Sequence, residues 1–170
     1  MTAETLSNDP LTTGATHGLS HTLKVWHRKY EIAANVEDGD IFELGYLPKN
    51  AVVCGGWVAA DDIDTGTEAL DIDVGWAANG GGSATYTDAE TGVTYTNAGA
   101  NASPSGLANV GVMTGDGSAE IYQAGVSYRA MVFPDPLWFS EKTKVQLEAN
   151  AAANAFAAGT FGVYILYYVL

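Results

Sequence analysis

The sequence predicts an all-β protein, an antiparallel β-sandwich of jelly-roll type with about eight strands. Hydrophobic residues make up 47% of the 170 residues and charged residues only 16%, which is enough apolar material for one packed domain. Short stretches of alternating apolar and polar residues recur between turn-forming residues. The chain also ends in a stretch that is apolar on both faces, 159–170, and a sheet has to cover such a strand on both sides.

This last stretch carries the strongest strand signal. Phe161, Val163 and Ile165 would face one way and Tyr164 and Tyr168 the other, because side chains alternate along a strand. Its β-branched and aromatic residues favour a strand over a helix. We therefore expect either a central core strand or a strand buried against a second copy of the protein. Tyr164 and Tyr168 are the candidate interface residues of this strand.

The other strands follow from alternation and from the turn signals between them. Gly, Pro, Asn and Asp separate the alternating stretches, as in the turn at 37–40. The stretch 51–60 contains Gly55 and Gly56, a pair that predicts a β-bulge or a close approach of another chain segment. The expected strands are 22–34, 41–44, 51–60, 69–74, 119–123, 126–133, 143–149 and 159–170.

The chain is expected to be one domain with an arm and an insertion. Residues 1–21 are polar and show no packed pattern, which predicts an N-terminal arm. Residues 22–170 are expected to form a single β-sandwich domain. Within it, 76–118 is rich in Gly, Ala, Thr and Asn and poor in large apolar residues, which predicts a long, loop-rich insertion. A small hairpin is expected inside this insertion, between 85–87 and 93–96.

The charge balance limits the partners that the chain can have. Acidic residues outnumber basic ones 20 to 7, giving a net charge of −13, so we predict no nucleic-acid partner. The start of the chain lacks the apolar segment of a secretory signal, and the final apolar run is too short to span a bilayer. We therefore expect a protein made in a cytoplasm, with no membrane partner. The single Cys54 excludes an internal disulfide and is expected to be a small core residue.

The residues give no sign of catalysis. The chain lacks a nucleophile motif, a zinc-protease motif and a phosphate-binding glycine loop, so we predict neither an enzyme nor a bound cofactor. The histidines have no further ligand beside them, and we predict no metal site. If Ca²⁺ did bind, the acidic stretch would supply Asp62, Asp64 and Asp73 as its ligands, although strand alternation also explains Asp73 as part of a solvated face.

The aromatic and basic residues indicate an interaction surface. Trp57 and Trp138 lie in apolar runs and are expected in the core or at a subunit interface. Trp76 borders the loop-rich stretch and is the tryptophan predicted to make a surface contact. Exposed aromatic residues also stack on sugars, so a carbohydrate-binding module is an alternative. A basic cluster on the first strand, which is either a partner site or a solvated face, consists of Lys24, Arg28 and Lys29.

Three segments together carry a family resemblance: 39–53, 65–75 and 158–170. The first runs from a Gly-Asp pair through an apolar strand and Leu-Pro-Lys to Ala-Val-Val. The second is a strand in which Asp alternates with apolar residues, and the third is a C-terminal strand that begins with Gly-Thr. This combination resembles small virion proteins of tailed bacteriophages.

The resemblance implies a structural role. It suggests a capsid decoration (cement) protein with a β-sandwich or jelly-roll core. Such a protein would bind the major capsid protein on the capsid exterior, would form a homotrimer and would be made in the host cytoplasm. A head-spike base, a neck protein or a tail protein fits the same resemblance.

Overall fold

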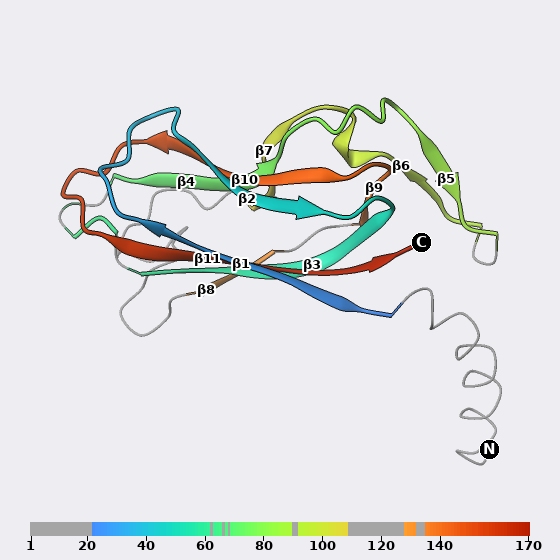
Figure 1. Ribbon diagram of the computed structural model, residues 1–170, viewed down its shortest axis with the longest axis horizontal. Coiled ribbons are helices and arrows are strands. Elements are labelled where there is room, and N and C mark those ends of the chain that lie inside the picture. The colour runs from blue at the N-terminus through green and yellow to red at the C-terminus, as the bar shows by residue number, and fades with distance from the viewer. Residues whose placement is uncertain are drawn as a thin grey trace, which may run out of the picture.

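A computed structural model shows two antiparallel β-sheets packed face to face (Figure 1), which confirms the predicted all-β class. The predicted arm 1–21 and the predicted strand 119–123 lie outside the described residues. For 128–131 the structure describes the backbone alone. Among the residues described, no helix is long and apolar enough to cross a membrane. The structure describes residues 22–61, 63–65, 67, 69–89, 92–108, 128–131 and 135–170.

The first sheet contains the terminal strand at its centre. Its strand order is β1-β11-β3-β8, and β9 also pairs with β3. The predicted central position of the last strand is therefore confirmed, because β11 pairs with β1 on one side and with β3 on the other. The five strands are β1 (Lys24–Ile32), β3 (Ala51–Ala60), β8 (Tyr128–Met131), β9 (Leu137–Phe139) and β11 (Gly159–Val169).

The second sheet has four strands in the order β2-β10-β4-β7. The first four strands of the chain alternate between the two sheets, so each connection crosses from one layer to the other. In the two strand orders β1 and β2 are both edge strands, and the indole N–H of Trp26 on β1 donates to the Tyr46 carbonyl on β2 at 3.0 Å. The four strands are β2 (Ile41–Leu47), β4 (Asp71–Trp76), β7 (Ser103–Ala108) and β10 (Thr143–Ala151).

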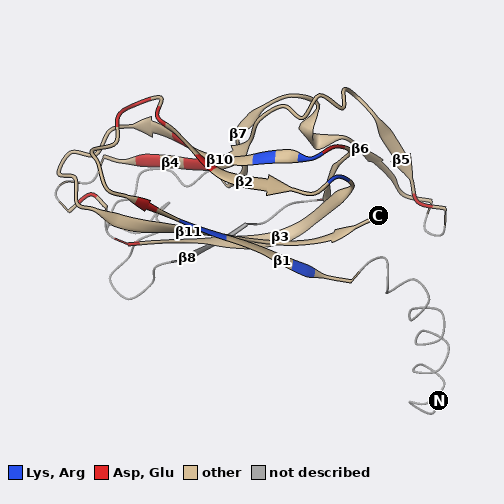
Figure 2. Cartoon of the chain, viewed as in Figure 1, with Lys and Arg blue, Asp and Glu red and all other residues tan. Residues whose placement is uncertain are grey.

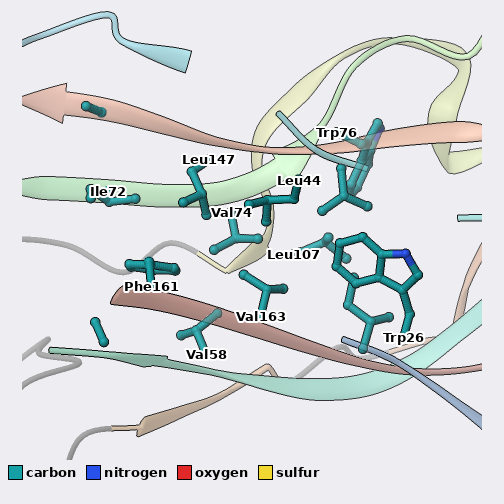
Figure 3. Packing of buried hydrophobic residues seen from close by; sticks show 14 of the residues in the cluster. Trp26, Leu44, Val58, Ile72, Val74, Trp76, Leu107, Leu147, Phe161 and Val163 are labelled. Atoms are coloured by element: carbon teal, nitrogen blue, oxygen red, sulfur yellow. The ribbon is translucent and has the colours of Figure 1, made fainter. Parts of the chain in front are cut away.

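The core lies between the sheets and is filled by the inward residues of both (Figure 3). Phe161, Val163 and Ile165 of β11 have no exposed surface. They meet inward residues of the second sheet, among them Val74 and Leu147. Full burial of one such side chain contributes about 1.5–3 kcal/mol. This face of the terminal strand therefore belongs to the core of the single chain.

Three expectations need correction. Residues 103–108, placed in the predicted insertion 76–118, form strand β7 of the second sheet. The sequence did not predict β7 because Pro104 and Gly106 are poor strand formers. An edge strand such as β7 tolerates both residues. The short strand β9 also went unpredicted. Finally, Cys54 is exposed rather than buried, because the ladder between β3 and β11 shifts register beside Gly55 and leaves Cys54 unpaired in a bulge.

Candidate interaction surface

The candidate site is the face of the five-stranded sheet that points away from the second sheet. On β11 the odd-numbered residues enter the core, so the even-numbered ones point outward, and the register extends this face to β1 and β3. The predicted interface residues Tyr164 and Tyr168 both lie on it. We call this surface the outer face, and its members are Val25, His27, Lys29, Val52, Trp57, Tyr164, Leu166 and Tyr168.

An aromatic stack crosses the middle of the outer face. The register places His27 and Trp57 directly on either side of Tyr164. The His27 and Tyr164 rings lie 4.0 Å apart at an interplanar angle of 10°, and those of Trp57 and Tyr164 lie 4.8 Å apart at 11°. Both faces of the Tyr164 ring are therefore covered. A sugar needs a free ring face to stack on, so Tyr164 cannot serve as the platform of a carbohydrate-binding site.

Sequence reasoning missed the other two members of this stack. Trp57 was expected in the core or at an interface, and His27 had no role. The signal that joins them to Tyr164 is their cross-strand register, which a single sequence does not contain.

Apolar side chains continue the outer face along the edge strand. Leu23 and Val25 are each 57% exposed, and Val25 lies opposite the half-buried Leu166. Exposed apolar residues that adjoin one another indicate a surface that binds another protein. The outer face thus combines an apolar strip with a fixed aromatic stack.

The side chains of the predicted basic cluster point to two different faces of β1. Lys29 points outward beside Tyr164. Lys24 and Arg28 share the side of β1 that carries Trp26, and the Arg28 guanidinium lies 5.4 Å from the Trp26 ring centre. Figure 2 shows the positive residues spaced along β1. They therefore form a basic edge of the sheet, and one of them, Lys29, belongs to the outer face.

A hairpin covers the far end of the outer face. Strands β5 (Thr85–Thr87) and β6 (Thr94–Thr96) pair as predicted. Tyr86 packs against Trp138 with ring centres 5.9 Å apart, and the Tyr95 hydroxyl lies 3.5 Å from that of Tyr168. Burial, followed by this hydrogen bond, raises the pKa of Tyr168 well above its usual range. Tyr168 is thus a neutral, half-buried residue beneath the hairpin, and Val52 beside it is fully buried.

The predicted surface role of Trp76 is wrong. This residue is 5% exposed and packs edge-on against Phe139, with ring centres 5.1 Å apart. Its indole N–H donates to the Asn101 carbonyl at 3.0 Å. The surface prediction failed because the residues that follow β4 have a loop-like composition, so Trp76 was not recognised as the last residue of this strand.

The candidate calcium ligands do not form a metal site in the described part of the chain. Asp64 is 1% exposed and accepts hydrogen bonds from the backbone N–H groups of Ala69, Leu70, Asn154 and Ala155. Burial alone would raise the Asp64 pKa, but these four bonds outweigh it and lower the pKa.

The other two candidates give no support to a cation either. Asp73 is 5% exposed and accepts from the Asn150 amide at 2.8 Å, and Asp62 lies outside the described residues. No three potential metal ligands come together among the residues that the structure describes. The carboxylate of Asp64 instead joins the 61–70 loop to the 152–157 loop.

Asp71 is expected to weaken the fold at neutral pH. Burial and then the nearby Asp73 raise its pKa, and its buried Oδ1 has no hydrogen-bond partner within the described residues. Because the folded state binds this proton more tightly than the unfolded state, stability is lost as pH rises above about 4. Asp71→Asn should therefore raise Tm at pH 7 and leave it nearly unchanged at pH 3.

Thermal unfolding at the two pH values tests this expectation. Asp38→Asn, which removes one carboxylate from an exposed turn, measures the general effect of lowering the net charge. An Asp71→Asn protein that is no more stable than the Asp38→Asn protein at pH 7 would contradict the argument.

The fold and the outer face together define the class of this protein. It is a two-sheet β-sandwich whose outer face is apolar and aromatic. No protein-family model matches the chain, and no curated protein sequence matches it. The solved structures that are similar over most of its length include two phage capsids. A chain of the cyanophage Pam1 capsid asymmetric unit has a TM-score of 0.63 and 22% identity, with 91% of this chain and 89% of that chain covered. A chain of the Ralstonia phage GP4 capsid has a TM-score of 0.53 and 20% identity, with 86% and 85% covered. The protein therefore shares its fold with chains of phage capsids.

Proposed function

We propose that this protein is a structural component of a phage virion that binds the outer surface of the capsid and stabilises contacts between major capsid protein subunits. The similarity of fold to a chain of the cyanophage Pam1 capsid over 91% of this chain carries the proposal. The crossing of successive strands between the sheets supports the jelly-roll assignment. Non-catalytic binding is all that this role requires.

The outer face is the surface that we assign to this binding. Its stacked rings have few rotamers to lose, so docking them costs little conformational entropy. Val25 and Leu166 supply apolar area, and Lys29 supplies a charge for an acidic group on the shell. We further propose that the protein acts as a homotrimer, with residues 1–21 as a tether. Several weak contacts then add up through avidity.

Co-sedimentation with capsids of the same phage tests the proposal. Val25→Asp places a charge in the apolar strip and is expected to weaken capsid binding about tenfold or more, as for the loss of a central interface contact. Tyr46→Asp is the matched control, since Tyr46 is 46% exposed on the second sheet. Equal binding by both variants and the wild type would remove the outer face from the interface.

The oligomeric state needs its own measurement. Light scattering of the purified protein is expected to give three times the 17.8 kDa mass of one chain. A monomer that binds capsids would overturn the preformed trimer alone. Failure to bind capsids, together with binding to isolated neck or tail assemblies, would move the protein elsewhere in the virion.

A further inference from the structure

A hollow of about 130 Å³ lies in the outer face, between the aromatic stack and the end of the sheet at which β11 begins. Residues of β1, of β11 and of the end of β3 line it. Those that matter for the argument are Lys29, Ala59, Asp61, Thr160, Gly162 and Tyr164.

Gly162 forms the floor of the hollow. It lies on the outward side of β11 opposite Ala59 and carries no side chain, so the sheet is thin at this point. A Cβ atom added to Gly162 would lie 3.3 Å from the edge of the Tyr164 ring and 3.9 Å from Cγ of Lys29. The ring and the lysine stem are therefore two walls of the hollow.

Charged groups of both signs border the hollow. On the β1 side is Lys29, and the ion pairs between described residues involve other lysines, so its ammonium keeps its donors. On the β3 side is the Asp61 carboxylate, whose Oδ2 accepts the Thr160 backbone N–H at 2.8 Å. One such bond leaves most of the acceptor capacity of a carboxylate unused. The register adds a second carboxylate at this end, because Glu31 lies opposite Thr160.

We propose that the hollow binds the carboxamide group of an asparagine or glutamine side chain of the shell protein. The choice of partner rests on the proposed function, which docks the outer face on the capsid. The amide carbonyl accepts a hydrogen bond from the Lys29 ammonium, and the amide N–H groups donate to the Asp61 carboxylate. Each bond has a charged protein partner, which makes it stronger than a bond between neutral groups.

Other kinds of side chain fit the hollow less well. A carboxylate is repelled by Asp61 and Glu31, and an ammonium or guanidinium is repelled by Lys29. An apolar side chain would cover the charged groups without giving them hydrogen bonds, which costs free energy. A carboxamide has no net charge and carries an acceptor and donors, so it complements both sides of the hollow.

The assignment leaves Lys29 free for the acidic group of the shell. An ammonium has three N–H donors, so one can serve the amide carbonyl while the others point away from the hollow.

Binding of short peptides to the full-length protein tests the proposal. The probes are acetylated pentapeptide amides with Gln, Glu, Lys or Leu between glycines, and the backbone amide shift of Gly162 reports binding. We expect the Gln peptide to bind at least about tenfold more tightly than the other three, as for the gain of a charge-assisted hydrogen bond. Equal binding of the four peptides, or no saturable shift with the Gln peptide, overturns the proposal.

A variant that changes the preference gives a second readout. Lys29→Met keeps the stem and removes the donors, so it should weaken binding of the Gln peptide about tenfold. Because only carboxylates then remain, the Lys peptide should become the tightest ligand of this variant. A Lys29→Met protein that binds the four peptides in the wild-type order would overturn the proposal.

Lys24→Met is the matched control, since the register places Lys24 on the other side of β1. If it weakens the Gln peptide as much as Lys29→Met does, the attraction is not specific to the hollow and the proposal fails. The peptide test uses no capsid, so its failure is distinguishable from a failure of capsid binding, which Val25→Asp probes.

Discussion

Replacing Asp64 with asparagine is expected to lower the free energy of unfolding by about 3–5 kcal/mol at pH 7. The Asp64 carboxylate accepts four backbone N–H groups at 2.7–3.1 Å from two loops. Asparagine has one side-chain oxygen, so at least one buried N–H group loses its acceptor. The bonds that remain also lose their charge assistance. Both losses act on the same contact between the 61–70 and 152–157 loops.

The pH dependence of this effect has a definite sign. The Asp64 pKa is lower in the folded state than in the unfolded state. Its contribution is therefore complete above about pH 4 and is lost as pH falls through the folded-state pKa. The stability difference between wild type and Asp64→Asn should thus shrink in acid. The difference for Asp71→Asn also shrinks in acid, but at pH 7 the two substitutions act in opposite directions: Asp64→Asn destabilises the protein and Asp71→Asn stabilises it.

Urea denaturation at pH 7 and in acid measures both quantities. Asp61→Asn is the control, because Asp61 is exposed and accepts one backbone N–H, that of Thr160, at 2.8 Å. Its substitution should cost about 1 kcal/mol or less. An Asp64→Asn protein as stable as the Asp61→Asn protein would show that the four bonds are not the main link between these loops.

The sequence alone predicted those strands whose local pattern of apolar and polar residues matches their burial in the structure. Alternation and turn residues located β1, β3, β10 and β11, and the all-apolar end of the chain placed β11 at the centre of its sheet. These strands carry their burial pattern in their own residues, so no knowledge of the partner strand was needed. The hairpin of β5 and β6 was predicted for the same reason, from two short Thr-Tyr-Thr strands around a turn.

The candidate site could be predicted only in part, because it depends on pairing across strands. Tyr164 and Tyr168 were found from the alternation of one strand. The stack of His27, Tyr164 and Trp57 joins residues far apart in sequence through a register set by the whole sheet. The structural role of Asp64 was missed for a related reason. Its acidic neighbours made it a candidate ligand in case a cation bound, whereas it accepts backbone N–H groups from its own loop and from a loop about 90 residues away.

The contact between the two edge strands shows the same limit. Tyr30 and Phe42 lie on either side of the predicted turn at 37–40, and the sequence gives no reason to connect them. Their ring centres lie 5.1 Å apart because β1 and β2 are edge strands on the same side of the sandwich. Features built from edges follow from the order of strands in a sheet, which local composition does not encode.

Replacing Gly75 with alanine is expected to destabilise the protein by about 3 kcal/mol or more. Gly75 lies on β4 where the pairing with β7 shifts register between Val74 and Trp76. A Cβ atom at this position would overlap the backbone carbonyl groups of Ser103 and Pro104. Backbone cannot move aside as a side-chain tip can, so the alanine has to push β7 away from β4.

Displacing β7 would disturb more than its contact with Gly75. Gly106 of β7 packs closely on the Trp76 ring, and Trp76 in turn packs on Phe139 of the other sheet. Moving β7 therefore loosens the packing that joins the two layers, and near-ultraviolet circular dichroism of the tryptophans should fall along with Tm. Substitution of Gly75 is thus expected to act on the whole sandwich.

Gly162→Ala is the matched control, since Gly162 is also a buried strand glycine. An added Cβ there meets the edge of the Tyr164 ring at 3.3 Å and otherwise keeps ordinary distances from its neighbours. A ring edge can give way by a few tenths of an ångström, so this variant should stay within about 1 kcal/mol of the wild type. If both alanine variants unfold at the wild-type urea concentration, close approach of β7 at Gly75 is not what holds this edge of the second sheet.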